Sequence, residues 1–147
     1  MRILSFSQPW CWGIFNASKR IENRSWLPPI ECIGQRFIIH AAKSWDADAI
    51  GFFLRLGLDG FPGRKDLYPS ACVVGVATIT RCVTKVDTLP PDQHRWYFGP
   101  CGWLLEDVRE LAADDRIPWK GAQGLRHATP ELVERVNAVL PRARICA

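Results

Sequence analysis

The stretch ACVVGVATITRCV, residues 71–83, carries the strongest β-strand signal in this chain of 147 residues. β-branched residues are frequent in it and apolar residues follow one another almost without a break, which is typical of a strand partly buried on both faces. Two further runs, residues 35–42 and 102–109, also have the pattern of strands. The sequence therefore predicts a sheet to which residues 71–83 contribute a buried strand.

On both sides of that strand, the chain mixes short strands with helices. The further expected elements are strands at 3–6 and 19–26 and helices at about 9–18, 46–57 and 130–140. The last helix has a clear start, because Thr129 can cap it and Pro130 suits its first position. Strands and helices do not alternate regularly, which argues against a doubly wound parallel sheet. The predicted class is α+β, a small mixed β-barrel flanked by helices.

Composition sets limits on the kind of protein. The length fits one domain, residues 1–147, and the net charge of +4 permits an anionic partner without requiring one. No export signal and no apolar stretch long enough to cross a bilayer is visible, so we expect a cytoplasmic protein without a membrane partner. The six cysteines form no C-x-x-C pair and no histidine lies at zinc-finger spacing from a cysteine pair, so we expect free thiols and no metal site. We expect no cofactor either.

A polar group of residues occupies the expected strand at 19–26. Glu22, Arg24 and Trp26 share one face by alternation, and Lys19 lies just before them. A lysine, a carboxylate and a guanidinium held together can bind a phosphate, polarise a carbonyl or share a proton. The alternative is a structural ion pair that joins the first helix to the barrel. Lys19 and Glu22 are thus candidate catalytic residues, and Arg24 and Trp26 are candidate nucleic-acid contacts.

Two more candidate site residues lie in the strand at 35–42 and at its end. His40 is the third candidate catalytic residue, as a general base, although a lone strand histidine is more often part of the core. Lys43, at the end of the strand, is better placed than His40 to reach a phosphate.

Further nucleic-acid contacts are expected at the first helix and in two loops. Ser7, Gln8 and Trp10 stand at the start of the helix, where free N–H groups favour an anion. Gln8 can read a base edge, whereas Trp10 either stacks on a base or fills the core. Phe98 lies in a tight loop that can wall a cleft, and Lys120 lies in a turn that can contact phosphate or stay solvated. The loop HRWY, residues 94–97, has a basic and aromatic composition that suits single-stranded nucleic acid. The alternative is a loop whose aromatic residues fill the core.

Six motifs occur in an order that resembles the ASCH family. They are SQPW at 7–10, K-x-x-E-x-R-x-W at 19–26, IHAAK at 39–43, VVGVA at 73–77, FGPCGWLLE at 98–106 and K-G-x-x-G-L at 120–125. The resemblance spans about residues 3–126, so the helix at 130–140 lies beyond it. The chain departs from the family pattern in two ways: Ala17 and Ser18 precede the motif lysine where a glycine is frequent, and Cys101 stands where an aromatic residue is usual.

The resemblance implies a PUA-like β-barrel with a polar cleft and binding of RNA or DNA. It also implies that some relatives are enzymes, including a hydrolase of acetylated cytidine and ribonucleases. The acetylcytidine hydrolases use a lysine followed three residues later by a threonine, a position that resembles Glu22 here. A carboxylate cannot replace a hydroxyl nucleophile, so we do not expect that chemistry, whereas hydrolysis with Glu22 as base or as the group that positions water stays open.

Three functions follow as hypotheses. The first is a domain whose cleft binds RNA, single-stranded DNA or a nucleotide, with or without a base modification, through the contacts above. The second is a metal-independent hydrolase of RNA or of a modified nucleoside that uses Lys19, Glu22 and His40. The third is a coregulator-like protein-interaction domain with an apolar patch on the loop 57–68.

Overall fold

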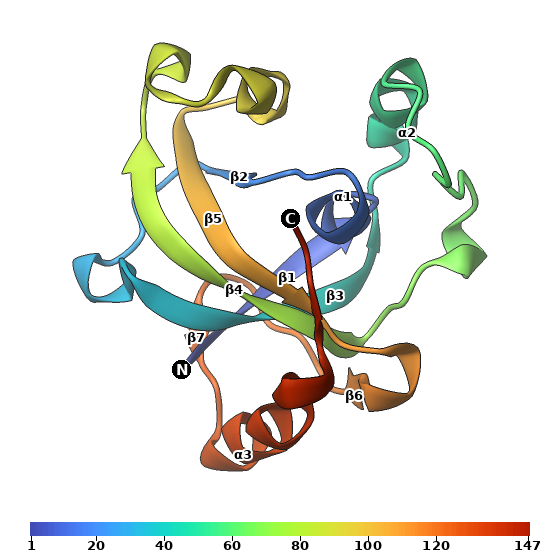
Figure 1. Cartoon of the computed structure of the whole chain (residues 1–147), viewed down its shortest axis with the longest axis vertical. Helices are drawn as coiled ribbons and strands as arrows, with labels where there is room; N and C mark the ends of the chain where they lie inside the picture. The colour runs from blue at the N-terminus through green and yellow to red at the C-terminus, as the bar shows by residue number, and fades with distance from the viewer.

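The computed structural model describes residues 1–147 and is built on one curled, mixed sheet (Figure 1). Its strands are β1 (Arg2–Gln8), β2 (Ile21–Arg24), β3 (Gln35–Trp45), β4 (Cys72–Val83), β5 (Cys101–Glu110), β6 (Ile117–Pro118), β7 (Arg126–His127) and β8 (Arg144–Ile145). The strands follow the order β2-β5-β4-β3-β1-β7, with β6 paired to β4 and β8 to β5. Only β1 and β3 run parallel. The prediction of an α+β fold with a mixed, barrel-like sheet is confirmed.

Helix α1 (Trp10–Asn16) lies in the hollow of the curled sheet (Figure 1). Its buried side chains, Cys11, Ile14 and Phe15, belong to the largest apolar cluster of the protein. Gly75 of β4 makes this packing possible, because a β-carbon there would lie 2.7 Å from the ring of Phe15. The helix is therefore an internal element, as its nearly all-apolar sequence predicts.

Strand β4 separates two apolar clusters, which explains its continuous apolar sequence. Val74 faces the cluster around α1, whereas Val73 and Val76 face a second cluster on the outside of the sheet. That outer cluster contains Leu132 and Val136 of α3 (Pro130–Val139). The N-terminal cap expected for this helix is present, since the Thr129 hydroxyl accepts the Leu132 N–H at 3.2 Å.

The boundaries of several elements differ from those expected. Helix α1 begins at Trp10 rather than Pro9, and β3 continues to Trp45. Strands β7 and β8 were not expected, because two residues are too few to show an alternating pattern. The helix expected at 46–57 is α2 (Ala47–Arg55), with Asp46 as its N-cap.

Two loops with aromatic residues pack largely inward. In the loop 57–68, Phe61 stacks on Phe53 of α2 with the ring centroids 5.1 Å apart, while Leu67 stays exposed. In HRWY, Trp96 is completely buried, so its ring is not available to stack on a base. All six cysteines are free thiols, and none of the helices combines the length and the apolar character needed to span a bilayer.

Candidate nucleic-acid cleft

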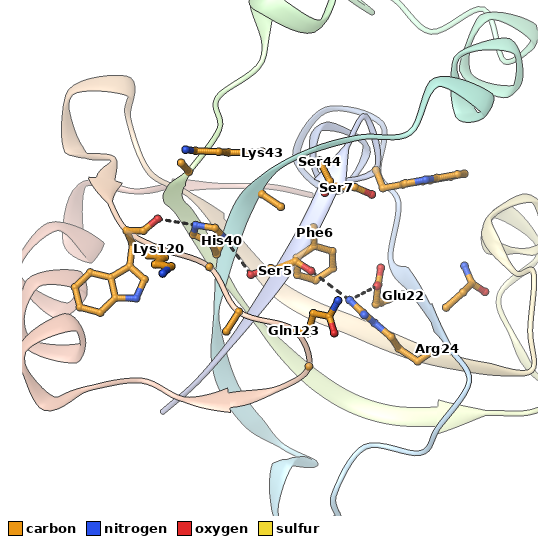
Figure 2. Close-up of a pocket in the computed structure, with 18 of the residues that line it drawn as sticks. Ser5, Phe6, Ser7, Glu22, Arg24, His40, Lys43, Ser44, Lys120 and Gln123 are labelled. Carbon is orange, nitrogen blue, oxygen red and sulfur yellow. Dashed lines mark hydrogen bonds and ion pairs between the residues drawn. The ribbon is translucent and has the colours of Figure 1, made fainter.

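A cleft of about 1240 Å³ opens where β1, β2 and the end of β3 meet the loop 119–124 (Figure 2). The loop 94–97 does not line it. Of the eleven other candidate site residues, all but one do: Ser7, Trp10, Lys19, Glu22, Arg24, Trp26, His40, Lys43, Phe98 and Lys120. The exception is Gln8. The cleft holds four cationic side chains and one carboxylate among its lining residues, which gives it a positive character.

Gln8 is buried beneath α1 and both ends of its amide are engaged. Its side-chain oxygen accepts the Trp12 N–H at 3.0 Å, and its side-chain nitrogen donates to the Pro69 carbonyl at 3.1 Å. Gln8 therefore anchors the first turn of the helix to the loop before β4. Trp10 is held in a similar way, since its indole N–H donates to Asp46 at 2.7 Å, but its ring reaches the cleft.

Lys19, Glu22 and Arg24 form a continuous ion chain along one wall. The Lys19 ammonium lies 3.2 Å from Glu22 Oε2, and the Arg24 guanidinium lies 2.8 Å from Glu22 Oε1. Lys19 is 1% exposed and also donates to the Ile21 carbonyl, so its charge is neutralised inside the protein. Burial lowers the pKa of Lys19, and the adjacent Glu22 carboxylate opposes this shift. These ion pairs fix Arg24 at the edge of the cleft, where its buried Nε–H has no acceptor.

His40 faces a different partner from the one expected. Its Nδ1 lies 3.0 Å from the Ser5 hydroxyl and its Nε2 lies 3.0 Å from the Trp119 carbonyl, whereas neither Lys19 nor Glu22 contacts it. A carbonyl only accepts, so Nε2 carries the proton and the Ser5 hydroxyl donates to Nδ1. Figure 2 shows Ser5 between His40 and Arg24.

Ser5 was missed by sequence reasoning. It becomes a neighbour of His40 through the parallel pairing of β1 and β3, in which Ser5 and His40 are register partners. The sequence predicts a strand at 3–6, but no local pattern identifies which strand lies beside Ser5.

The rim of the cleft combines free cations with exposed aromatic rings. Lys43 and Lys120 are exposed, and no carboxylate lies within 4.0 Å of either. Trp26 is 37% and Phe98 55% exposed. These two rings rest on other aromatic residues, Trp26 on Trp103 at 4.6 Å and Phe98 on Trp10 at 5.6 Å between centroids. The rim thus offers charge for phosphate and ring faces for a base.

Comparison with protein families gives a match to the ASCH domain over residues 4–112, which is most of the chain. The chain belongs to the ASCH domain family. ASCH domains have a PUA-like fold and generally bind RNA. None of the curated proteins matches this ASCH chain.

Two solved structures share the fold of this ASCH domain. One is the crystal structure of ASCH from Zymomonas mobilis, with a TM-score of 0.53, 17% identity, and coverage of 98% of this chain and 96% of that one. The other is a crystal structure of a tyrosine-to-phenylalanine mutant of the ASCH protein from Zymomonas mobilis, with a TM-score of 0.52, 18% identity, and coverage of 94% and 96%. At this identity the likeness concerns the fold, and it confirms the predicted PUA-like architecture.

The buried His40 makes the stability of this ASCH domain depend on pH. Burial lowers the pKa of His40 below its ordinary value of 6.5, so below that pH the unfolded chain takes up a proton that the folded protein does not. The free energy of unfolding should therefore fall as the pH is lowered below 6.5, by at most about 1.4 kcal/mol per pH unit. In urea unfolding at pH 7 and pH 5, His40→Asn should lose less stability between the two pH values than the unsubstituted protein.

The exposed His127 provides the matched control for that measurement. His127→Asn should retain the full loss of stability between pH 7 and pH 5. Equal losses in the unsubstituted protein and in His40→Asn would show that His40 is not the group responsible.

Proposed function

We propose that the cleft binds a single-stranded RNA segment, seating an unpaired base against the rim aromatics and the adjacent phosphates against the cations. The observation that supports this most is the convergence of Arg24, Lys43 and Lys120 with Trp26 and Phe98 on one cavity. Cations hold phosphate, while aromatic rings stack on any base, and together they are the usual means of binding single strands. Single-stranded DNA, or a free or modified nucleotide, would use the same contacts.

The volume of the cleft fits this proposal. About 1240 Å³ exceeds the usual range for small-ligand pockets, so there is room for a nucleotide and part of its neighbour. A paired base cannot reach the rim rings without leaving its stack, which favours unpaired strands over a duplex.

Binding should depend steeply on salt. With about three phosphate contacts, the logarithm of the affinity for single-stranded RNA should fall with the logarithm of the salt concentration at a slope of about −2. In Lys43→Ala/Lys120→Ala the slope should shrink to about −0.7, since one cation remains. Fluorescence anisotropy with labelled single-stranded RNA, single-stranded DNA and duplex RNA at several salt concentrations measures both the slope and the preference.

Lys85 is the matched control, because it is an exposed lysine outside the cleft. Lys85→Ala should leave affinity and slope unchanged. If no member of the panel binds in a salt-sensitive way at micromolar protein, the proposed function is wrong.

The cytoplasm is the compartment that we propose for this binding. Six free cysteines suit a reducing environment, since thiols in oxidising compartments tend to form disulfides.

A further inference from the structure

RNA binding leaves one feature of the cleft unused, the hydrogen bond between the Ser5 hydroxyl and His40. We propose that Ser5 and His40 form a nucleophile–base pair that hydrolyses carboxylic esters of anionic alcohols bound in the cleft. A hydroxyl next to a general base, with that base oriented by a third group, is the arrangement that activates a nucleophile. Here the third group is the Trp119 carbonyl.

The protonation state of His40 suits the role of a base. Because Nε2–H donates to the Trp119 carbonyl, the unprotonated Nδ1 points at the Ser5 hydroxyl, 3.0 Å away. Burial also keeps the imidazole neutral at neutral pH by lowering its pKa. Once His40 has taken the proton, the same carbonyl stabilises the imidazolium, since both ring nitrogens then donate.

The loop 119–124 passes close to the pair, and it can do so because residue 121 is a glycine. A β-carbon at Gly121 would lie 2.5 Å from His40 Cε1 and 2.8 Å from Ser5 Oγ. Any side chain there would press on both members of the pair. Ser5 and His40 both line the cavity, so a bound ester can approach the hydroxyl from that side.

Arg24 is placed to stabilise the negative charge that forms during attack. Its guanidinium donates to the backbone carbonyl of Ser5 at 3.4 Å, which brings the cation next to the residue that attacks. Donors already held beside the reacting centre stabilise an oxyanion effectively, because they need no reorganisation. The ion pair with Glu22 holds the guanidinium in this position.

The reaction proceeds in two balanced steps. First, Ser5 Oγ bonds to the acyl carbon while its proton passes to His40 Nδ1; the bond between that carbon and the alcohol oxygen breaks, and His40 returns the proton to the departing oxygen. Second, water attacks the acyl-Ser5 carbon while His40 takes a proton from it; the bond to Ser5 Oγ breaks, and the proton returns to Ser5. The products are the free alcohol and the carboxylic acid.

The preference for an anionic alcohol, such as an O-acylated nucleotide, rests on the proposed function, whereas the chemistry of Ser5 does not. Lys43 and Lys120 line the same cavity as His40 and would hold a phosphate on the alcohol portion. A neutral ester lacks that contact and should react without their help.

Two acetyl esters test the proposal, neutral p-nitrophenyl acetate and 2′(3′)-O-acetyl-AMP. Release of p-nitrophenol and of AMP should fall at least about a hundredfold in Ser5→Ala and in His40→Asn. The control Ser70→Ala, at an exposed serine that does not line the cleft, should stay within about twofold of the unsubstituted rate. Lys43→Ala/Lys120→Ala should raise KM for the acetyl nucleotide and leave p-nitrophenyl acetate unaffected.

Mass spectrometry of the quenched, unsubstituted protein makes the test independent of how the variants fold. An acetyl group on Ser5 supports the proposal; acetyl groups only on lysines, or a rate in Ser5→Ala equal to the unsubstituted rate, overturn it. Equal effects of the double lysine substitution on both esters would overturn the choice of an anionic alcohol. If Ser5 is acetylated but no RNA binds, the proposed RNA binding is wrong and the nucleophilic role of Ser5 is supported. If RNA binds but Ser5 is not acetylated, RNA binding is supported and the nucleophilic role of Ser5 is wrong.

Discussion

Replacing Glu22 with alanine should lower the free energy of unfolding by about 3–5 kcal/mol, because a buried charge loses its partner. The Lys19 ammonium is almost completely buried, and Glu22 is the only carboxylate within 4.0 Å of it. Arg24 would lose its ion pair in the same step. Urea unfolding followed by tryptophan fluorescence measures the effect.

A double substitution separates the charge effect from general damage. In Lys19→Met/Glu22→Gln, no buried ammonium is left without a partner, so much of the lost stability should return. Glu131 forms an exposed pair with Arg135 at 3.7 Å, and Glu131→Ala should cost no more than about 0.5 kcal/mol. A similarly small loss for Glu22→Ala would mean that Lys19 reaches solvent or another partner.

Removing the rim aromatics should weaken RNA binding strongly. Trp26→Ala and Phe98→Ala should each cost about 1–3 kcal/mol of binding free energy, or roughly 5- to 150-fold in Kd, if each ring stacks on a base. Phe98→Leu keeps the apolar contact with Trp10 but lacks the ring face, so its affinity should fall between those of the unsubstituted protein and Phe98→Ala. Anisotropy at one fixed salt concentration gives the comparison.

Leu67→Ala controls for the loss of an exposed apolar side chain outside the cleft, and it should bind RNA normally. Thermal melting should show that the aromatic variants remain folded, since Phe98 and Trp26 are partly exposed. Unchanged affinity in both Trp26→Ala and Phe98→Ala would exclude stacking at the rim.

Local patterns in the sequence predicted the main elements of the fold and most of the cleft. Interactions between residues close in sequence can be predicted from local patterns. They account for the β-branched run at 71–83, the apolar first helix and the Thr129 cap. The cleft residues were recovered because ordered motifs that resemble a family bring distant segments together, although spacing alone does not reveal their contacts.

The parts that sequence did not reveal depend on long-range packing. The Gln8 amide could hydrogen-bond to a base edge, but its nitrogen donates instead to the carbonyl of Pro69, sixty-one positions away. Trp96 lies in a basic and aromatic loop, yet α2 supplies an apolar site that buries it. The Ser5–His40 contact arises from strand register, which alternation does not specify.

Chemical-shift mapping shows whether single-stranded RNA enters the cleft. On titration of ¹⁵N-labelled protein with a short single-stranded RNA, we expect shifts at the Trp26 indole and the backbone amides of Lys43, Phe98 and Gly121, all of which line the cleft. Resonances of α3 on the outer face of the sheet should stay in place. Shifts confined to α3, with none in the cleft, would contradict the claim.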